Sequence, residues 1–279
     1  MLDATRRLTE RAGSPSEARL EAELLLAHAL ELPRARMLLR LREIELPLEV
    51  ARRFDSLLSR RAQGAEPVSL LLGVRGFYDL ELAVDRRVLS PRPETEELIE
   101  SFALLVERDA LPAGPVADWG TGSGALARVL RRWRPVLALE RSPEARAVAL
   151  GNLAQGLVQQ PWLLAAADGL SPVRPASLAA VLANPPYIEP ADYPGLPDDV
   201  RLFEPRAALV PDDGDVPGLY ARIGREAQRC LVPGGWLLIE VGAGQAQQLE
   251  AALARSGLTP AGRRKDLLGH ERVLCLRCS

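Results

Sequence analysis

The sequence predicts an α/β fold with a mostly parallel, seven-stranded sheet, preceded by a small helical domain. From residue 115 onward, short apolar runs that suit buried strands alternate with amphipathic segments that suit helices, which is the order that parallel sheets require. Before residue 75, apolar residues recur at helical spacing. We therefore expect a helical bundle over 1–75, a linking β-hairpin over 76–90 and an α/β domain over 91–279.

The N-terminal bundle is predicted from a helix-start signal and from helical periodicity. Residues 14–17, Ser-Pro-Ser-Glu, are typical of a helix start, because the first Ser can cap free N–H groups, Pro suits the first turn and Glu completes a capping box. Helices are expected over 18–32, 35–42 and 48–62. Short helices of this kind bury their apolar stripes in a small bundle.

The region that follows changes to strand character. Residues 77–84 alternate apolar and polar side chains, which is typical of a half-buried strand, and 85–87 (Asp-Arg-Arg) would turn the chain into 88–89. A helix is expected over 94–107, with acidic residues in its first turn. Beyond it we expect seven strands, over 116–119, 136–139, 162–165, 178–183, 236–241, 258–263 and 271–276.

Composition argues against several classes of protein. The formal net charge is −2, so the chain lacks the overall basic field of proteins that bind nucleic acids non-specifically. No apolar run is long enough to span a membrane, and the N-terminal residues lack the apolar core of a signal peptide. We therefore expect a cytoplasmic protein that binds no membrane and forms no stable complex with nucleic acid.

The three cysteines do not predict a metal site. Cys275 and Cys278 form a C-x-x-C pair at the C-terminus, but a zinc site would need about two more ligands. Only Cys230, His28 and His270 remain to supply them. We expect no metal and interpret the pair as part of the last strand and its end.

The stretch Asn184-Pro185-Pro186-Tyr187 organises the α/β domain. It directly follows the apolar run 178–183, and its two prolines can neither continue a strand ladder nor form an ordinary helical turn. The strand therefore stops abruptly, with an amide side chain and an aromatic ring just beyond it. In open α/β sheets, ligands bind outside the carboxyl ends of strands. These residues are therefore predicted to receive a small planar group.

The segment Gly120-Thr121-Gly122-Ser123-Gly124 follows the first strand of the α/β domain. Its glycines allow a ligand to approach the backbone, and the helix after them favours a negative group such as a carboxylate. The spacing G-x-G-x-G differs from the G-x-G-x-x-G of pyrophosphate binders. By itself the segment would also suit a tight strand-to-helix turn.

Acidic residues end the next two strands. Glu140 lies about 20 residues after the glycines, where an acidic side chain typically accepts hydrogen bonds from ribose hydroxyls. Asp168, or the backbone of Gly169 beside it, is placed to meet an adenine edge. With the glycine segment and Asn184, these strand ends describe a pocket for an adenosine that carries an amino acid, which is S-adenosylmethionine. Its methyl group would point at Asn184.

At this point the sequence resembles a known family. Asn-Pro-Pro-Tyr in this place resembles the signature of class I methyltransferases that modify a planar nitrogen. The wider set of motifs covers nearly the whole chain and resembles the PrmC/HemK family of protein-glutamine N5-methyltransferases. These motifs lie at 72–75, 91–96, 120–124, 184–188, 203–205, 208–209, 265–266 and 271–273. The segment 91–96 (Pro-Arg-Pro-Glu-Thr-Glu) followed by 184–187 is specific to this family.

The resemblance implies a Rossmann-like methyltransferase domain over 91–279 and a specific reaction. The family transfers a methyl group from S-adenosylmethionine to N5 of the glutamine in the Gly-Gly-Gln motif of class I peptide chain release factors, leaving S-adenosylhomocysteine. By resemblance, the Asn184 side-chain oxygen and the Pro185 carbonyl accept hydrogen bonds from the substrate amide. Pro186 belongs to the same substrate site, and Tyr187 packs on the amide plane.

The resemblance also bears on the partner. The helical domain and the segment 189–218 would select the release factor, and we expect the enzyme to be a monomer. The chain departs from the family pattern at four positions. Trp119 and Gly76 stand where relatives often carry Leu and Glu, Glu140 replaces a commoner Asp, and Gly169 stands where relatives often have an aromatic residue.

Two other functions stay open on the sequence alone. A nucleic-acid methyltransferase acting on adenine N6 or guanine N2 could use the same Asn-Pro-Pro-Tyr for the exocyclic amine of a flipped base. A non-catalytic protein could bind S-adenosylmethionine and merely hold release factors or ribosomes. The net charge and the lack of a recognisable target-recognition domain oppose the first, and the intact acceptor motif opposes the second.

Overall fold

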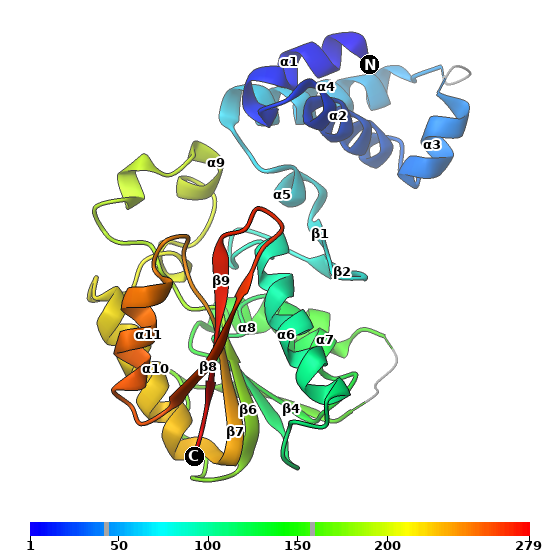
Figure 1. The fold of residues 1–279 in the computed structure, drawn as a ribbon. Helices are drawn as coiled ribbons and strands as arrows, with labels where there is room; N and C mark the ends of the chain where they lie inside the picture. Colours follow the sequence, from blue (N-terminus) through cyan, green and yellow to red (C-terminus); the bar gives the residue numbers. More distant parts are fainter. Residues whose placement is uncertain (42–44, 157–159) are drawn as a thin grey trace. The chain divides into compact units, whose positions relative to one another are not determined.

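The chain folds into two compact units (Figure 1), and the computed structural model describes residues 1–41, 45–156 and 160–279. The helical unit comprises Met1–Val74 together with Leu196–Phe203. The sheet unit comprises Arg75–Gly195 together with Glu204–Ser279. The chain therefore passes from one unit to the other three times, after residues 74, 195 and 203.

The helical unit consists of short helices whose starts follow from the sequence. Ser14 caps one of them as predicted, since its Oγ accepts a hydrogen bond from the Glu17 backbone N–H at 3.2 Å. The helix expected over 35–42 begins one residue earlier, and Arg42 lies outside the described residues. The helices are α1 Leu2–Ala12, α2 Pro15–Ala29, α3 Arg34–Arg40, α4 Leu48–Gly64, α5 Val68–Leu72 and, within the later segment, α9 Asp198–Arg201.

Ion pairs attach the segment 196–203 to this unit. Arg61 on α4, only 6% exposed, donates to both carboxylate oxygens of Glu21 on α2, at 2.8 and 3.0 Å. The same guanidinium lies 3.5 Å from the Asp199 carboxylate on α9. A buried charge that loses its partner is costly, so this arrangement keeps α9 with the helical unit.

The sheet unit is built on a seven-stranded sheet, which confirms the predicted fold class. The strand order is β5-β4-β3-β6-β7-β9-β8, and every neighbouring pair is parallel except the two pairs that β9 forms. The strands are β3 Val116–Trp119, β4 Val136–Glu140, β5 Trp162–Ala166, β6 Leu178–Ala183, β7 Leu231–Glu240, β8 Thr259–Lys265 and β9 Glu271–Arg277. The chain leaves β3 toward one edge through β4 and β5 and returns to the other side of β3 with β6. The carboxyl ends of β3 and β6 therefore form the switch point at which α/β proteins bind ligands.

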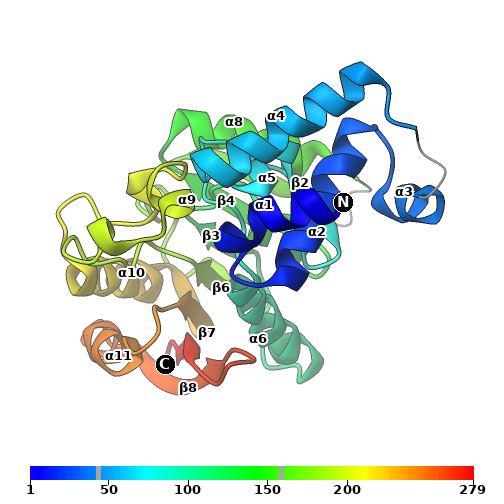
Figure 2. The same ribbon diagram turned by 90° about the horizontal axis from the view of Figure 1, so that it is seen from above.

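Helices cover both faces of this sheet (Figures 1 and 2), so strand residues alternate between two cores. In β6, Val181 and Ala183 belong to the core shared with α10 and α11, whereas Ala180 and Leu182 belong to the core shared with α6, α7 and α8. Every residue of β6 is buried for this reason. The helices are η1 Pro93–Thr95, α6 Glu96–Glu107, α7 Ala125–Leu130, α8 Pro143–Ala154, η2 Tyr193–Gly195, η3 Arg206–Ala208, α10 Val216–Cys230 and α11 Ala246–Ala254.

The linking hairpin is present, but its turn lies earlier than the sequence predicted. Strands β1 Val74–Phe77 and β2 Leu80–Ala83 form a two-stranded sheet, so the hairpin turns at residues 78–79. The chain also turns at 85–88, where the Val88 N–H donates to the Asp85 carbonyl at 3.2 Å, but this turn follows the hairpin and does not join its strands. Tyr78 adopts a left-handed φ of 56°, and its N–H donates to the Glu96 carboxylate on α6 at 2.8 Å. The position of the turn thus depends on a hydrogen bond to a residue outside the hairpin. The alternation of apolar and polar residues in the sequence cannot indicate such a contact.

Two strands of the sheet carry fully buried carboxylates near their ends. Asp118 in β3 is 1% exposed and Glu240 at the end of β7 is 0% exposed. Burial disfavours the charged form and raises the pKa of Asp118 to about 6 and the pKa of Glu240 to about 7. Both groups therefore make the stability of this unit depend on pH.

Glu240→Gln should change the pH dependence of stability. The pKa of Glu240 in the folded state lies above its ordinary value of 4.5, so its contribution to the free energy of unfolding is full below that pH and is lost as the pH rises to about 7. A pKa difference of one corresponds to about 1.4 kcal/mol. Denaturant titrations between about pH 5 and about pH 8 should show the Gln variant gaining stability relative to the native protein as the pH rises. A difference that does not vary with pH would contradict this reading.

Arg61→Ala should release α9 from the helical unit. The change leaves the half-buried Glu21 carboxylate on α2 without its cation and removes the partner of Asp199. Hydrogen exchange measured by mass spectrometry should become faster in 196–203. Arg53→Ala is the matched control on α4, because its pair with Glu31 is exposed and contributes little to stability. The same exchange rate in both variants would exclude this role for Arg61.

Candidate active site

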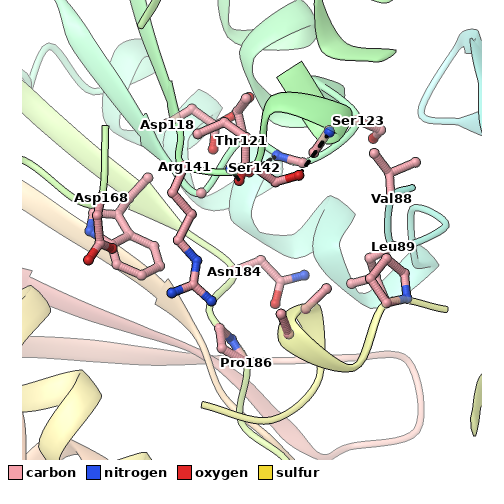
Figure 3. A pocket seen from close by; sticks show the side chains of 18 of the residues that line it. Val88, Leu89, Asp118, Thr121, Ser123, Arg141, Ser142, Asp168, Asn184 and Pro186 are labelled. Atoms are coloured by element: carbon pink, nitrogen blue, oxygen red, sulfur yellow. Dashed lines mark hydrogen bonds between the residues drawn. The ribbon is translucent and has the colours of Figure 1, made fainter. Parts of the chain in front are cut away.

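A pocket lies at the carboxyl ends of β3, β4, β5 and β6 (Figure 3). All residues that line it belong to the sheet unit. Its walls combine residues 120–123 of the glycine loop (residues 120–124), acidic and amide side chains at strand ends, and part of the loop 205–213. The residues predicted from the sequence that line it are Gly120, Thr121, Gly122, Ser123, Glu140, Asp168, Gly169, Asn184 and Pro186.

Gly124, the last glycine of the loop, lies outside this lining. It precedes α7 with a left-handed φ of 82°, and a Cβ at this position would lie 3.4 Å from the Ala149 Cα on α8. Gly124 thus serves the close packing of α7 against α8. Its predicted contact with a cofactor stays a prediction.

Pro185 and Tyr187 also lie outside the lining. Pro185 is buried and Tyr187 is half-buried. The Tyr187 hydroxyl lies 3.5 Å from Glu240 Oε1, and the Tyr187 carbonyl accepts a hydrogen bond from Gln245 Nε2 at 3.0 Å. Burial raises the pKa of the Tyr187 phenol well above its ordinary value, so the hydroxyl stays protonated. In this structure the Tyr187 side chain packs against the core shared with α10 and α11.

Asp118, to which the sequence analysis gave no role, shapes the glycine loop. Its Oδ2 accepts hydrogen bonds from the Thr121 hydroxyl within the loop and from the Ala127 N–H in α7, the latter at 3.0 Å. Gly120 and Gly122 adopt left-handed φ values of 68° and 55°, a conformation that favours glycine. One buried carboxylate therefore anchors both the loop and the helix that follows it.

Glu140 connects the glycine loop to the end of β4. Its Oε2 accepts a hydrogen bond from the Gly122 N–H at 3.0 Å, and its Oε1 accepts one from the Ser142 N–H at 2.9 Å. The residue is 9% exposed and lines the pocket. A carboxylate oxygen can accept more than one hydrogen bond, so Glu140 retains acceptor capacity for hydroxyl groups of a ligand.

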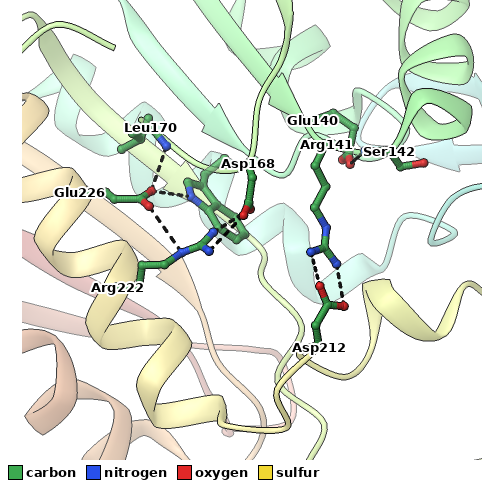
Figure 4. Close-up of polar contacts among 9 residues, drawn as sticks. Glu140, Arg141, Ser142, Asp168, Leu170, Asp212, Arg222 and Glu226 are labelled. Atoms are coloured by element: carbon green, nitrogen blue, oxygen red, sulfur yellow. Dashed lines mark hydrogen bonds and ion pairs between the residues drawn. The ribbon is translucent and has the colours of Figure 1, made fainter. Parts of the chain in front are cut away.

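Asp168 forms an ion pair at the pocket wall (Figure 4). Arg222 on α10 donates to both Asp168 oxygens, at 2.7 and 3.2 Å, and this pairing lowers the pKa of Asp168. The Arg222 guanidinium carbon also lies 5.7 Å from the centroid of the Trp119 ring. Because all three residues line the pocket, this end of it presents an aromatic ring and an ion pair.

Glu226 accounts for the glycine at position 169. A Cβ on Gly169 would lie 2.3 Å from Glu226 Oε2, and Gly169 has a left-handed φ of 74°. The Glu226 carboxylate is held in place because it accepts hydrogen bonds from Trp119 Nε1 at 3.2 Å and from the Leu170 N–H at 2.8 Å. A larger residue at 169 would displace it. The pocket takes its aromatic ring from Trp119 instead.

A second ion pair joins β4 to the loop 205–213. Arg141, directly after β4, donates through both terminal nitrogens to the carboxylate of Asp212 (Figure 4). The two side chains are 44% and 65% exposed, so the pair contributes little to stability. Both residues line the pocket, and their contact holds the loop at its rim.

Asn184 lies at the carboxyl end of β6, and its amide is held from one side. Asn184 Nδ2 donates to the hydroxyl of Thr95 at 2.9 Å. Thr95 also lines the pocket and belongs to the motif 91–96. With its NH2 group bonded in this way, the Asn184 side chain offers Oδ1 as an acceptor for a ligand.

Asn152 on α8 is a structural support that the sequence analysis missed. It is 0% exposed, and its Nδ2 donates to the Ala83 and Ser123 carbonyls at 2.9 and 2.8 Å. Its Oδ1 accepts a hydrogen bond from the Ala83 N–H at 2.8 Å. Asn152 thus joins the hairpin to the glycine loop. A single Asn inside a helix gives no positional signal in a sequence.

No cluster of three or more His, Cys, Asp or Glu side chains suited to a metal occurs among the described residues. Cys275 in β9 and Cys278 just after it are free thiols, and burial raises the pKa of Cys275 to about 11. Its thiol is therefore protonated at neutral pH. In the same described parts of the chain, no helix combines the length and the apolar character needed to cross a membrane.

Comparison with known proteins gives matches along the whole chain. A family model described as the PrmC N-terminal domain matches residues 1–73. The chain is 39% identical over 269 residues to the release factor glutamine methyltransferase of Cereibacter sphaeroides, which covers 95% of this chain and 93% of that protein. It is 43% identical over 254 residues to the release factor glutamine methyltransferase of Moorella thermoacetica, covering 89% and 86%.

Solved structures share the fold. The hMettl16 catalytic domain matches with a TM-score of 0.56 and 14% identity, over 82% of this chain and 81% of that one. A methyltransferase from Pyrococcus furiosus matches with a TM-score of 0.50 and 14% identity, over 81% and 98%. Identities this low indicate the fold alone, which is that of a methyltransferase. The close relatives indicate more: over most of its length, this chain belongs to the release factor glutamine methyltransferase family.

Proposed function

We propose that the enzyme transfers the methyl group of S-adenosylmethionine to N5 of the glutamine in the Gly-Gly-Gln motif of class I peptide chain release factors, with S-adenosylhomocysteine as product. The names of the relatives support this activity. One observation carries the assignment of the site: Asn184 at the end of β6 lines the same pocket as the glycine loop and Glu140. A methyl acceptor bound by Asn184 and a methyl donor bound by the loop would therefore share one cavity.

The pocket residues fit S-adenosylmethionine, whose sulfonium supplies an activated methyl group. In this proposal, backbone N–H groups of the glycine loop bind its carboxylate. Glu140 binds the ribose hydroxyls, because each of its oxygens already accepts one hydrogen bond, from Gly122 or Ser142, and has capacity for another. Asp168 and Gly169 border the adenine at the end of the pocket that carries the aromatic ring.

The substrate amide needs orientation, because its nitrogen lone pair is delocalised into the carbonyl. In this proposal, Asn184 Oδ1 and the Pro185 carbonyl accept the two amide N–H groups and aim the nitrogen at the methyl carbon. Orienting two bound reactants can lower a barrier by up to about 7–11 kcal/mol. The same acceptors stabilise positive charge as it develops on the nitrogen, by about 3 kcal/mol per group on the scale of oxyanion donors. The methylated nitrogen then loses a proton to solvent.

The remaining substrate contacts are proposed for Pro186, which lines the pocket, and for Tyr187, which would pack on the amide plane once the substrate is bound. We propose that the helical unit and the segment 189–218 select the release factor. The course of the chain supports this, because the segment that leaves Tyr187 enters the helical unit at Leu196. We further propose a monomeric enzyme that acts in the cytoplasm and binds no nucleic acid stably.

A labelled methyl donor tests the proposal directly. Purified class I release factor, tRNA and plasmid DNA are each incubated with the enzyme and radiolabelled S-adenosylmethionine. Label is expected only in the release factor, and peptide mass spectrometry should place one methyl group on the glutamine of Gly-Gly-Gln. Label in either nucleic acid, or an unmodified glutamine, would overturn the proposed function.

Asn184→Ala should nearly abolish turnover, because it removes an acceptor that acts on the reacting nitrogen. The expected loss in kcat is about 100- to 1000-fold, the scale of removing one oxyanion donor. Calorimetric titration with S-adenosylhomocysteine should show that cofactor binding survives. Glu140→Ala is the companion variant. It should weaken the binding of S-adenosylhomocysteine, which Asn184→Ala leaves intact. Near-normal turnover of Asn184→Ala would contradict the role assigned to Asn184.

A further inference from the structure

A chain of hydrogen bonds runs from the pocket into the core of the sheet unit. Asn184 Nδ2 donates to Thr95 Oγ1 at 2.9 Å, and Thr95 Oγ1 donates to Glu240 Oε2 at 2.7 Å. Thr95 is 5% exposed and Glu240 is 0% exposed. The three residues come from the end of β6, from η1 and from the end of β7, so three separate elements converge on one amide.

The chemistry of this chain gives it a direction. In the structure Glu240 Oε2 accepts the single hydroxyl proton of Thr95 at 2.7 Å, and above about pH 7, where Glu240 is ionised, it can only accept. Thr95 Oγ1 can then only accept, and the group of Asn184 that faces it must be the NH2. The Asn184 side chain is thereby prevented from turning over, and Oδ1 is the atom left for a ligand in the pocket.

We propose that Thr95 and Glu240 are positioning residues for methyl transfer, which fix the amide of Asn184 with its oxygen toward the substrate. The inference rests on the function proposed above, in which Asn184 Oδ1 accepts a hydrogen bond from the reacting amide. Were the amide turned over, its NH2 would meet the NH2 of the substrate, and the acceptor would be lost. In this proposal Thr95 and Glu240 act through Asn184 and do not themselves bind the reacting amide.

The burial of Glu240 supports a role beyond packing. It forms no ion pair with any residue that the structure describes, and Arg272, the cation whose charge acts on it, is itself paired with Asp266 at 2.8 Å. Its remaining side-chain contact is the Tyr187 hydroxyl at 3.5 Å, and its backbone carbonyl accepts from Tyr220 Oη at 2.6 Å. Burying a carboxylate without a paired cation is costly, so packing alone would favour an uncharged side chain here.

The first test replaces Thr95. Thr95→Val keeps the shape and removes the hydroxyl, so kcat for release factor methylation should fall about 10- to 100-fold, the scale of a small misplacement of a reacting group. The KM for release factor and the affinity for S-adenosylhomocysteine should stay at native values. Thr95→Ser restores the hydroxyl and should recover most of kcat. Ser101→Ala is the matched control, because it removes another buried hydroxyl on α6, 4% exposed, whose one hydrogen bond to a described residue is to the Glu97 carbonyl.

The second test uses Glu240→Gln, which stays informative even if Thr95→Val fails to fold. The Gln NH2 can donate to Thr95, which turns the hydroxyl proton toward Asn184 and favours the inverted amide. Turnover should therefore fall, although the variant is expected to be at least as stable as the native protein at neutral pH. A purely structural role for Glu240 would not lower kcat while leaving stability and cofactor affinity intact.

The outcomes separate this inference from the proposed function. Native kcat in folded, cofactor-binding Thr95→Val and Glu240→Gln would overturn the positioning role, and so would a loss in Thr95→Val that Thr95→Ser fails to repair. If Asn184→Ala is inactive, the proposed function stands after either of these results. If instead Asn184→Ala keeps its turnover, or the native enzyme leaves the release factor unmodified, the proposed function itself fails.

Discussion

The pairing of β3 with β6 is the constraint on which the sheet unit depends. Their register places Trp119 beside Ala183, so the first residues beyond the two strands, Gly120 and Asn184, begin at neighbouring places along the edge of the sheet. The connections then diverge, because β4 and β5 continue to one side of β3 while β6 and β7 lie on the other. A shift of one residue in this register would move each β6 side chain from one core to the other, so the packing of both cores fixes the position at which Asn-Pro-Pro-Tyr follows the strand.

Buried polar groups then fix the positions of the loops and side chains that line the pocket. Asp118 anchors the glycine loop, Asn152 joins that loop to the hairpin, and Glu240 acts through Thr95 on the amide of Asn184. Each of these groups gives up water for a small number of hydrogen bonds, and two of them are carboxylates whose pKa is raised by burial. A fold selected for stability alone would avoid such groups. Their common effect is to hold backbone and side-chain atoms at the rim of one pocket.

The sequence predicted the fold class and most of the pocket, because both depend on local patterns. The strands at 116–119 and 178–183 were predicted with the observed bounds, since the second is apolar throughout, the first is apolar except for Asp118, and they end at a Gly and at Asn-Pro-Pro. What the sequence could not predict depends on distant partners. The hairpin turns at Tyr78, where Glu96 accepts a hydrogen bond from its N–H, and a side chain at 169 would have to displace the Glu226 carboxylate and adopt a left-handed φ. Thr95 lies in a motif quoted for the family, but its partners, Asn184 and Glu240, lie at the ends of two strands that are far from it in the sequence.

The route of the chain has a consequence for the evolution of the family. Because residues 196–203 fold with the first 74 residues, the helical unit is discontinuous, and its two pieces are encoded on either side of most of the catalytic domain. An exchange of the N-terminal piece between two homologues would leave Asp198 and Asp199 facing foreign counterparts of Arg11 and Arg61. A substitution at Arg11 or Arg61 therefore changes the surroundings of the second piece as well. The helical unit thus depends on contacts with the loop that follows Asn-Pro-Pro-Tyr, and its N-terminal piece by itself lacks them.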